Sequence, residues 1–227
     1  MRKNLLKKSR LYPVRSGAPR RGASNGIYLI LDRPILKRFS LEDVFSIISS
    51  RYIGLVQLRD KKSPKSKVLD LAIKLSKRLS RTKTLFIIND YADVALASLA
   101  DGVHLGQDDL SLRAARKILG KDKIIGISCH NLSQALKAQK EGADYIGIGP
   151  VYETSTKPEC SAIGLKAAAE LKAKIKIPYF AIGNICEANI DEITAAGIRR
   201  IAVCRAILGA GNPQEAAKRL YKKLRKS

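Results

Sequence analysis

An eightfold repeat runs through this chain from residue 26 almost to its last residue. Each unit starts with a short apolar run rich in β-branched residues, passes a Gly, Asp or Asn, and continues into a longer segment with helical spacing. The apolar runs predict strands at residues 26–32, 53–59, 84–88, 102–105, 124–128, 145–149, 178–182 and 200–204. Apolar strands that alternate with helices indicate a parallel sheet covered on both faces.

Eight such units in 227 residues favour closure of the sheet into a (β/α)8 barrel, the TIM-barrel fold, as a single domain. Segment 65–80 is typical of the helical part, because its apolar residues fall on one stripe and its lysines on the other. A doubly wound open sheet is the alternative. It is disfavoured because Leu-Asp-Arg-Pro, rather than G-x-G-x-x-G, follows the first strand. We expect the barrel to cover residues 26–227 and residues 1–25 to form a basic, flexible extension.

The formal net charge of +23 is concentrated at the two ends of the chain. Residues 1–25 hold eight Lys or Arg and no acid, and residues 213–227 hold six against Glu215. A basic surface of this kind attracts RNA or an anionic membrane. The ends lack the run of interleaved aromatic residues that base stacking needs, so nucleic acid is not the expected partner.

Neither a membrane span nor a disulfide framework is predicted. No apolar run approaches the roughly 20 residues that cross a bilayer, and the N-terminus lacks an apolar stretch of signal-peptide length. We therefore expect a cytoplasmic protein. The four cysteines are widely spaced without a C-x-x-C pair, which favours reduced thiols over a disulfide or a zinc site. The sequence leaves the oligomeric state open, a homo-oligomer included.

The carboxyl ends of the strands and the loops after them carry the functional argument, because catalytic groups of such barrels come from there. After the second strand, alternation points Gln57, Arg59 and Lys61 to one side, and two cations beside an amide suit a diphosphate. Asp90 and Asp109 follow the third and fourth strands, and this pair of carboxylates fits a hard cation such as Mg²⁺. Helix N-capping is the commoner role of a single Asp in such a place.

The fifth strand end carries Ser128, Cys129 and His130 in succession. Alternation places Ser128 and His130 on one side and Cys129 on the other, which disfavours a nucleophilic pair of Cys129 with His130. We interpret Ser128 as a hydrogen-bonding ligand. His130 is either an acid or base, or a structural histidine.

The last three strand ends add hydroxyls, a cation and backbone NH groups. The long polar loop after the sixth strand carries Thr154, Thr156 and Lys157, and loops of this size in compact barrels often close over a ligand. Gly183-Asn184 and Cys204-Arg205 end the seventh and eighth strands ahead of helices. The backbone at these two places is the usual phosphate cradle of the fold.

In this order and spacing, the segments Q-L-R-D-K, I-N-D, D-G-V-H-L-G-Q-D-D, G-I-S-C-H, G-I-G-P-V-Y-E-T-S-T-K and A-I-G-N-I resemble the thiamine phosphate synthase family over about residues 26–222. The resemblance implies that hydroxymethylpyrimidine diphosphate is joined to hydroxyethylthiazole phosphate, or to its carboxylated form, giving thiamine phosphate and diphosphate. Diphosphate would depart with the help of Mg²⁺, and the thiazole nitrogen would attack the resulting pyrimidine carbocation. No protein nucleophile is required.

The resemblance also assigns ligands to each substrate. The pyrimidine diphosphate would be bound by Gln57, Arg59, Lys61, Asn89, Ser128 and Lys157, of which Arg59, Lys61, Ser128 and Lys157 would also act in catalysis. Mg²⁺ would be held by Asp90 and Asp109. The thiazole phosphate would be bound by Thr154, Thr156, Gly183, Asn184, Cys204 and Arg205. Asn184 departs from the family pattern, which usually has a second glycine there, and Arg205 stands where a small residue, often Ser, is usual.

Two other functions are compatible with the barrel. A thiazole tautomerase of the same superfamily would use His130, but it has little need for paired carboxylates with a metal. It also tends to lack the Asn-Asp, second Asp and T-x-T-K groups, all of which this chain carries. A non-catalytic regulatory or RNA-binding barrel would use the basic ends as its contact surface. The retained diphosphate and metal groups favour the synthase over both.

Overall fold

The computed structural model describes residues 26–154 and 161–226, and it forms a closed barrel of eight parallel strands in sequence order. The strands are β1 (Ile27–Asp32), β2 (Ile53–Arg59), β3 (Leu85–Asn89), β4 (Gly102–Leu105), β5 (Ile124–Cys129), β6 (Tyr145–Ile148), β7 (Tyr179–Ile182) and β8 (Ile201–Val203). Each lies within one residue of its predicted bounds, so the predicted barrel is confirmed. The predicted extension, residues 1–25, lies outside the described residues.

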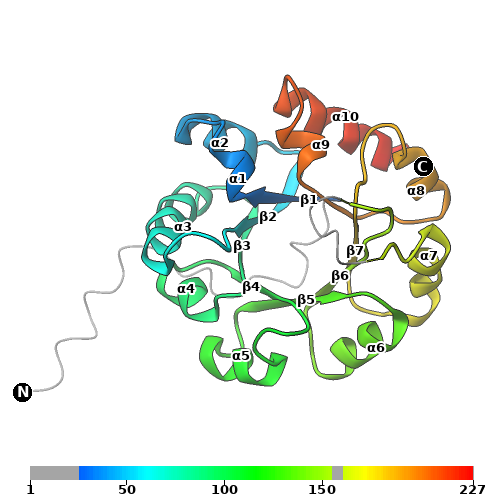
Figure 1. The fold of residues 1–227 in the computed structure, drawn as a ribbon, viewed down its shortest axis with the longest axis horizontal. Helices are drawn as coiled ribbons and strands as arrows, with labels where there is room; N and C mark the ends of the chain where they lie inside the picture. Colours follow the sequence, from blue (N-terminus) through cyan, green and yellow to red (C-terminus); the bar gives the residue numbers. More distant parts are fainter. Residues whose placement is uncertain (1–25, 155–160, 227) are drawn as a thin grey trace, which may run out of the picture.

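Helices surround the barrel, as Figure 1 shows. They are α1 (Arg33–Leu36), α2 (Leu41–Ile48), α3 (Lys65–Leu79), α4 (Ala92–Ala97), α5 (Leu112–Leu119), α6 (Leu132–Lys140), α7 (Leu165–Lys174), α8 (Ile190–Ala195), α9 (Arg205–Leu208) and α10 (Pro213–Arg225). Local sequence fixes where several begin: the side chains of Ser40, Ser111, Asn131 and Asn212 accept a backbone N–H in the first turns of α2, α5, α6 and α10.

Two apolar layers follow from the alternation of side chains along the strands. The larger layer lies between strands and helices and contains residues such as Leu29, Val56 and Ile146. The smaller layer contains Tyr28, Leu55, Leu85, Ile87, Tyr145, Phe180 and Ala202. These residues alternate with those of the larger layer, so they fill the barrel interior, which is a packed core in this fold.

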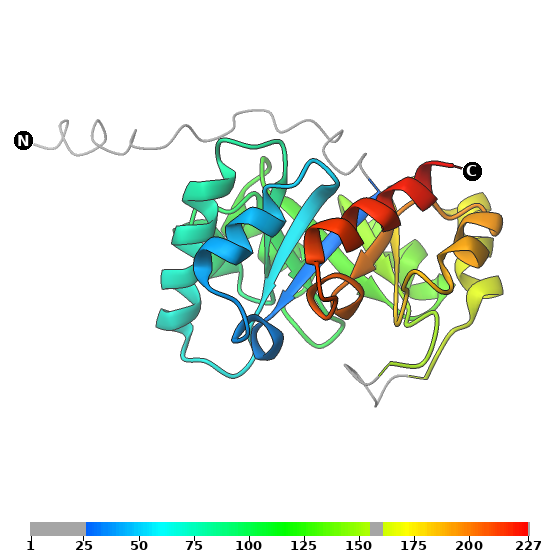
Figure 2. The ribbon, with the colours of Figure 1, turned by 90° about the horizontal axis from the view of Figure 1, so that it is seen from above.

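The register of neighbouring strands brings polar side chains together at one end of the barrel. Asp32 of β1 pairs with Arg59 of β2, and Asn89 of β3 pairs with His104 of β4. Because all strands are parallel, their carboxyl ends share one face, toward the lower edge of Figure 2. That face is where the functional groups of the sequence converge.

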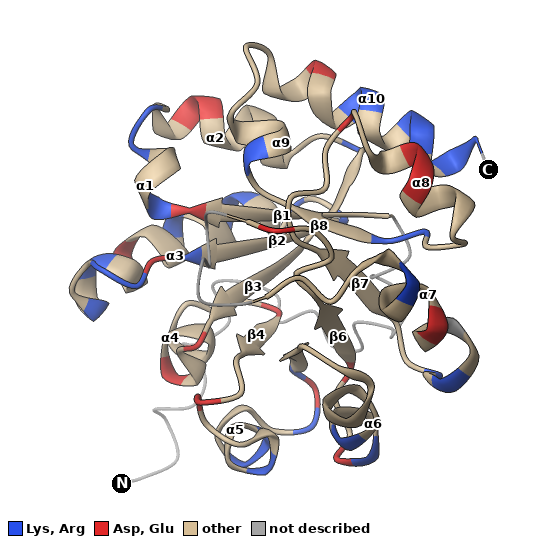
Figure 3. Ribbon diagram, turned by 45° about the vertical axis from the view of Figure 1, so that its right-hand side comes forward, with Lys and Arg blue, Asp and Glu red and all other residues tan. Residues whose placement is uncertain are grey.

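Charged residues are plentiful on the outside of the barrel. Figure 3 shows Lys and Arg on the outer helices, α3 and α10 among them. In the part of the chain that the structure describes, no helix is both long and apolar enough to cross a membrane.

Candidate active site

A cavity of about 360 Å³ opens at the carboxyl ends of the strands. Of the fourteen residues that the resemblance assigns to the substrates or the metal, twelve line it: Gln57, Arg59, Lys61, Asn89, Asp90, Asp109, Ser128, Thr154, Gly183, Asn184, Cys204 and Arg205. The remaining two, Thr156 and Lys157, lie outside the described residues. The structure thus brings together in one cavity groups that are spread over about 150 positions of the chain, while the roles assigned to them stay predictions.

The second strand end has the predicted alternation. Gln57, Arg59 and Lys61 face the cavity, whereas Leu58 belongs to the larger apolar layer between strands and helices. Asp60 is buried, and its carboxylate accepts hydrogen bonds from the backbone nitrogens of the loop two and three residues later, which fixes the turn after the strand. The loop therefore holds the cationic side chains over the barrel mouth.

Asp32 is a site residue that the sequence analysis missed. Its carboxylate lies 2.6 Å from Nη1 of Arg59, and both side chains are largely buried. The ion pair orients the guanidinium, and the carboxylate offsets part of its positive charge. The signal was available, because Asp32 is the polar residue at the carboxyl end of the first strand.

The carboxylates of Asp90 and Asp109 lie close enough together to share a hydrogen bond. Asp90 has a side chain only 13% exposed, and its carboxylate contacts Nζ of Lys61 at 3.0 Å. Burial, and after it the neighbouring Asp109 carboxyl, raises the pKa of Asp90 above its ordinary value. Two carboxylates forced together in a half-buried place need a proton or a cation to offset their repulsion.

Neither carboxylate caps a helix, so the capping role expected for a single Asp is wrong at both positions. Tyr91 and Ser111 occupy the N-cap positions of α4 and α5. Asp90 adopts the left-handed backbone region with φ 63°, and Asp109 accepts from the backbone nitrogen of Gly106 at 2.6 Å. A strained non-glycine residue is characteristic of functional sites, where the surrounding structure compensates for the strain.

The pair also fits a magnesium ion. Mg²⁺ in substrate sites is held by one or two carboxylates and completes its shell with water and phosphate oxygens. Among the described residues no group of three or more His, Cys, Asp and Glu converges on a point, so an all-protein cage is absent there. The donor set is therefore that of an ion bound together with a phosphorylated ligand.

A chain of buried hydrogen bonds lies beneath the cavity. Nε2 of His104 is 2.9 Å from Oγ of Ser128, and Nδ1 of His104 is 3.0 Å from the hydroxyl of Tyr145. The Tyr145 hydroxyl contacts that of Tyr28 at 3.1 Å, and the amide nitrogen of Gln57 donates to Tyr28. The sequence analysis gave roles to Gln57 and Ser128, at the two ends of this series of hydrogen bonds, and missed Tyr28, Tyr145 and His104.

Cys129 and His130 do not contact each other as a nucleophilic pair. The buried Cys129 belongs to the larger apolar layer between strands and helices, and burial raises the pKa of its thiol to about 12. His130 places Nδ1 2.6 Å from the carbonyl oxygen of Gly149, so this nitrogen carries a proton and donates it. The geometry agrees with the alternation argued from the sequence.

The seventh and eighth strand ends form the opposite side of the cavity. Gly183 and Asn184 both have a positive φ, of 113° and 49°. A Cβ atom on Gly183 would stand 2.6 Å from Cα of Pro150, so only glycine allows the two loops to approach this closely. Cys204 is the N-cap of α9, and Arg205 begins it, whereas α8 starts only at Ile190. A helix start therefore adjoins the cavity after β8 and not after β7.

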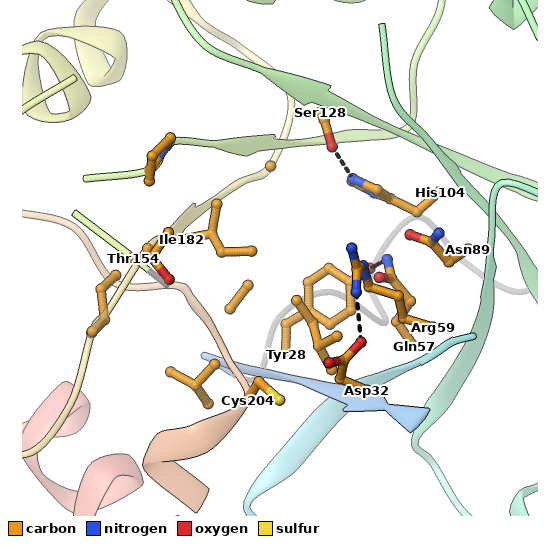
Figure 4. A pocket seen from close by; sticks show the side chains of 18 of the residues that line it. Tyr28, Asp32, Gln57, Arg59, Asn89, His104, Ser128, Thr154, Ile182 and Cys204 are labelled. Atoms are coloured by element: carbon orange, nitrogen blue, oxygen red, sulfur yellow. Dashed lines mark hydrogen bonds and ion pairs between the residues drawn. The ribbon is translucent and has the colours of Figure 1, made fainter. Parts of the chain in front are cut away.

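Figure 4 shows the two sides facing each other. Asn89, His104, Gln57 and Arg59 lie on one side, with Asp32 beside Arg59, and Thr154 and Ile182 lie across the cavity. One side offers cations, an amide, a hydroxyl and paired carboxylates. The other offers a hydroxyl, a glycine loop and a helix start, so the two sides of the cavity differ in chemistry.

Comparison with known proteins agrees with this geometry. The sequence profile of the family described as thiamine monophosphate synthase matches residues 27–207. The thiamine-phosphate synthase of Clostridium acetobutylicum is 39% identical over 201 residues, which are 88% of this chain and 95% of that protein. The solved structure titled thiamine phosphate pyrophosphorylase from Pyrococcus furiosus superposes with a TM-score of 0.81 at 33% identity, covering 90% of this chain and 98% of that one.

Some relatives are longer than this chain. The thiamine-phosphate synthase of Prochlorococcus marinus is 43% identical over 174 residues, which are 77% of this chain but 50% of that protein. The chain thus spans about half the length of that relative and nearly the whole length of the Clostridium protein.

Proposed function

This chain belongs to the thiamine monophosphate synthase family, and we propose that it joins hydroxymethylpyrimidine diphosphate to hydroxyethylthiazole phosphate, giving thiamine phosphate and diphosphate. One observation carries the proposal: a single cavity holds the cation and carboxylate groups of β2 to β4 on one side and the glycine loop and helix start of β7 and β8 on the other. Such a cavity can hold a diphosphate and a monophosphate at once, each with its own ligands.

The diphosphate is assigned to the side formed by β2 to β5. Arg59 offers a planar fork of N–H donors for phosphate oxygens, and Lys61 offers a compact charge on a half-exposed side chain. Asn89 and Gln57 are buried at the cavity wall and supply polar contacts to the ring end of the substrate. Lys157, outside the described residues, would complete this set as the sequence predicts.

Asp90 and Asp109 would hold Mg²⁺, which neutralises charge on the departing diphosphate when it is bound. The raised pKa of Asp90 supports this assignment, because the carboxyl pair carries an unfavourable interaction that a cation would relieve. The protein's own part is to hold the carboxylates in place, through Lys61 on one and the Gly106 nitrogen on the other.

The thiazole phosphate is assigned to Thr154, Thr156, Gly183, Asn184, Cys204 and Arg205. Asn184 keeps the left-handed conformation that a glycine would adopt there, and Asn accepts this region better than most residues. Arg205 brings an exposed cation to the first position of α9, beside the backbone expected to cradle the phosphate. Both departures from the family pattern are therefore compatible with an anion at this place.

The reaction breaks the bond between the pyrimidine methylene carbon and the diphosphate oxygen, and the electron pair leaves with diphosphate. The aminopyrimidine ring delocalises the positive charge, and the lone pair of the thiazole nitrogen forms the new carbon–nitrogen bond. No protein nucleophile takes part. Burial raises the pKa of Cys204 to about 11, so this cavity thiol stays protonated at neutral pH and does not compete for the cation.

The test is thiamine phosphate formation from the two synthetic substrates with Mg²⁺, with matched neighbours as controls. We expect Asp109→Asn and Lys61→Ala to lower kcat/KM by roughly 10²–10³-fold, the usual loss for a group that stabilises developing charge. Asp108→Asn and Lys62→Ala change exposed neighbours and should leave turnover unchanged.

Two other results would redirect the assignment. A native chain that forms no thiamine phosphate but isomerises a thiazole carboxylate phosphate, in a reaction lost in His130→Gln, would be a tautomerase. Salt-sensitive RNA binding without turnover, lost on removal of residues 1–25, would make the chain a binding protein.

A further inference from the structure

The hydrogen-bond chain beneath the cavity runs across the barrel from one ligand of the proposed pyrimidine site to another. Its members are Gln57, Tyr28, Tyr145, His104 and Ser128, and we call it the floor chain. Tyr28 and Tyr145 are 2% exposed, and His104 and Gln57 are 7% and 3% exposed. Only the two end residues carry a role assigned from the sequence, and the three between them have none.

The middle of the floor chain is rigidly packed. The ring of Phe180 meets those of Tyr28 and Tyr145 edge to face, at centroid distances of 5.2 and 5.7 Å. A Cβ atom on Gly126 would stand 2.1 Å from Cζ of Tyr145, so the ring occupies space that any other residue at this position would fill. The two phenols therefore hold fixed positions below the cavity.

The tyrosines remain phenols at any pH at which the protein works. Burial raises the pKa of Tyr28 and of Tyr145 far above the ordinary value near 10. Each hydroxyl therefore carries one proton and can donate one hydrogen bond. Because each hydroxyl can donate only one hydrogen bond, the bonds along the floor chain can be directed in only a few ways.

The direction follows from the Gln57 end. The amide nitrogen of Gln57 is a donor only, so the Tyr28 hydroxyl accepts from it. We assign the next bond as Tyr28 donating to Tyr145, because the reverse direction would leave the buried Tyr28 proton without an acceptor in the floor chain. The Tyr145 hydroxyl in turn donates to Nδ1 of His104. His104 must then be neutral with its proton on Nε2, and this proton is donated to Oγ of Ser128.

We propose that the floor chain fixes His104 in the Nε2-protonated tautomer, so that the Ser128 hydroxyl must donate its own proton into the cavity while Gln57 presents its carbonyl oxygen as an acceptor. His104 and Tyr145 are then positioning residues that set the polarity of the two ends. The pattern of one donor and one acceptor recognises a planar ring that carries an acceptor nitrogen and an amino group. The identity of that ring rests on the proposed function, whereas the tautomer of His104 does not.

The proposed polarity differs from two other states of the site. An imidazolium at His104 would donate from both nitrogens, and the Tyr145 proton would then lack an acceptor in the floor chain. The Nδ1-protonated tautomer would leave Nε2 to accept from Ser128, which would turn the hydroxyl proton away from the cavity. That second arrangement is the one a serine nucleophile needs, so the inferred polarity makes Ser128 a ligand and not a nucleophile.

The first experiment is nitrogen-15 NMR on ligand-free, histidine-labelled protein at neutral pH. The chain contains two histidines, and a His130→Gln variant assigns their signals. We expect His104 with a protonated Nε2 and an unprotonated Nδ1, and His130 with a protonated Nδ1, because His130 donates from this atom to the Gly149 carbonyl. A protonated Nδ1 on His104 would overturn the proposal. This readout needs no substrate, so it stands even if the proposed reaction fails.

The second experiment asks whether Tyr145 acts through Ser128. We expect Tyr145→Phe to lower kcat/KM for the pyrimidine diphosphate by roughly 10–100-fold, with the KM for the thiazole phosphate unchanged. In a Ser128→Ala background the same change should have almost no further effect, because the two residues act as one unit. Equal losses in both backgrounds would refute the coupling. Tyr179→Phe, on the outer face of β7, is the matched control and should retain native turnover.

Discussion

Substitution of two glycines on neighbouring strands, Gly126 on β5 and Gly147 on β6, should have different effects. One change should lower stability and the other substrate binding. A Cβ atom at Gly126 would stand 2.1 Å from Cζ of the buried Tyr145, an overlap that no side chain tolerates. A Cβ atom at Gly147 would stand 3.4 and 3.6 Å from Cε1 and Nε2 of His104, which is near ordinary contact. Gly147 lines the cavity beside Ser128, its register partner. The same substitution therefore acts on the core at one position and on the cavity at the other.

The expected loss of stability in Gly126→Ala follows from what must move. Overpacking a core costs about 1–3 kcal/mol. Displacing the Tyr145 ring also breaks its hydrogen bonds to His104 and Tyr28, at roughly 1–3 kcal/mol for each buried group left unpaired. The free energy of unfolding should fall by about 3–9 kcal/mol, a large part of the roughly 5–15 kcal/mol that holds a domain folded.

Gly147→Ala should change the free energy of unfolding by less than about 1 kcal/mol, because its methyl group meets only ordinary contacts. The methyl group would, however, stand in the cavity beside Ser128, a proposed ligand of the pyrimidine substrate. A displacement of about 1 Å at a reacting centre costs on the order of 10²-fold in rate. We expect a loss of that size in kcat/KM for the pyrimidine diphosphate and an unchanged KM for the thiazole phosphate.

Urea unfolding and steady-state kinetics on both variants decide the matter. The urea midpoint of Gly126→Ala should fall by about 1.5–4.5 M, given slopes near 2 kcal/mol per molar for a chain of this size. Gly211→Ala is the control, because a Cβ atom there has no heavy atom within 4 Å. The reasoning fails if Gly147→Ala keeps kcat/KM within about threefold of native, or if it loses as much stability as Gly126→Ala.

Three further results are expected. Asp109→Asn should raise the melting temperature of the metal-free protein, because it relieves a repulsion on Asp90 worth roughly 0.5–2 kcal/mol. It should also abolish the rise in melting temperature that Mg²⁺ causes, whereas Asp108→Asn should do neither; thermal unfolding with and without the ion is the measurement. The pKa of Cys129 is raised from 9.0 to about 12 in the folded protein, so the thiol's contribution to stability is complete below pH 9 and is lost as the pH rises toward 12. The free energy of unfolding, measured with urea between pH 9 and 10.5, should fall by up to about 1.4 kcal/mol per pH unit, and less steeply in Cys129→Ala. Asn184→Gly should be as stable as the native chain in urea, whereas Asn184→Val should lose about 1–2 kcal/mol, because φ is 49° there.

The strands were predictable because a parallel barrel buries both faces of its sheet. Runs such as 53–59 and 124–128 stand out as apolar in a chain of 28% charged residues, and their ends match the structure within one residue. The site was predictable for a related reason. Polar residues at strand ends have no place in the core, so Gln57, Arg59 and Ser128 had to face the cavity or the solvent.

The helix caps show where a local rule was insufficient. Asp is a frequent N-cap residue, and both Asp90 and Asp109 stand ahead of a helix. Ser111 lies two positions nearer to its helix than Asp109 and takes the cap, accepting from the Ala114 nitrogen. The choice between two capping residues depends on the backbone path of the loop, which a single sequence does not give.

The floor chain was beyond the reach of the sequence for a different reason. Tyr28 and Tyr145 are 117 positions apart and meet only after the barrel has closed. In the sequence each reads as an apolar strand residue, and His104 as one polar residue within the apolar strand β4. Hydrogen-bond partners across a barrel interior depend on register and closure together, and neither is visible in the pattern of a single strand.

The balance of charge inside the cavity explains why the net charge of the chain is a poor guide to its function. Among the described residues that line the cavity, three cations face three carboxylates: Arg59, Lys61 and Arg205 against Asp32, Asp90 and Asp109. Arg59 is already paired with Asp32, and Lys61 with Asp90, so the described residues of the cavity contribute none of the net charge of +23. A diphosphate that enters a cavity of balanced charge needs a further cation beside it. The carboxyl pair, with the raised pKa of Asp90, is where that cation would find its ligands. The same pairing keeps both basic side chains oriented before the substrate arrives, so the ligand meets donors that are already in place.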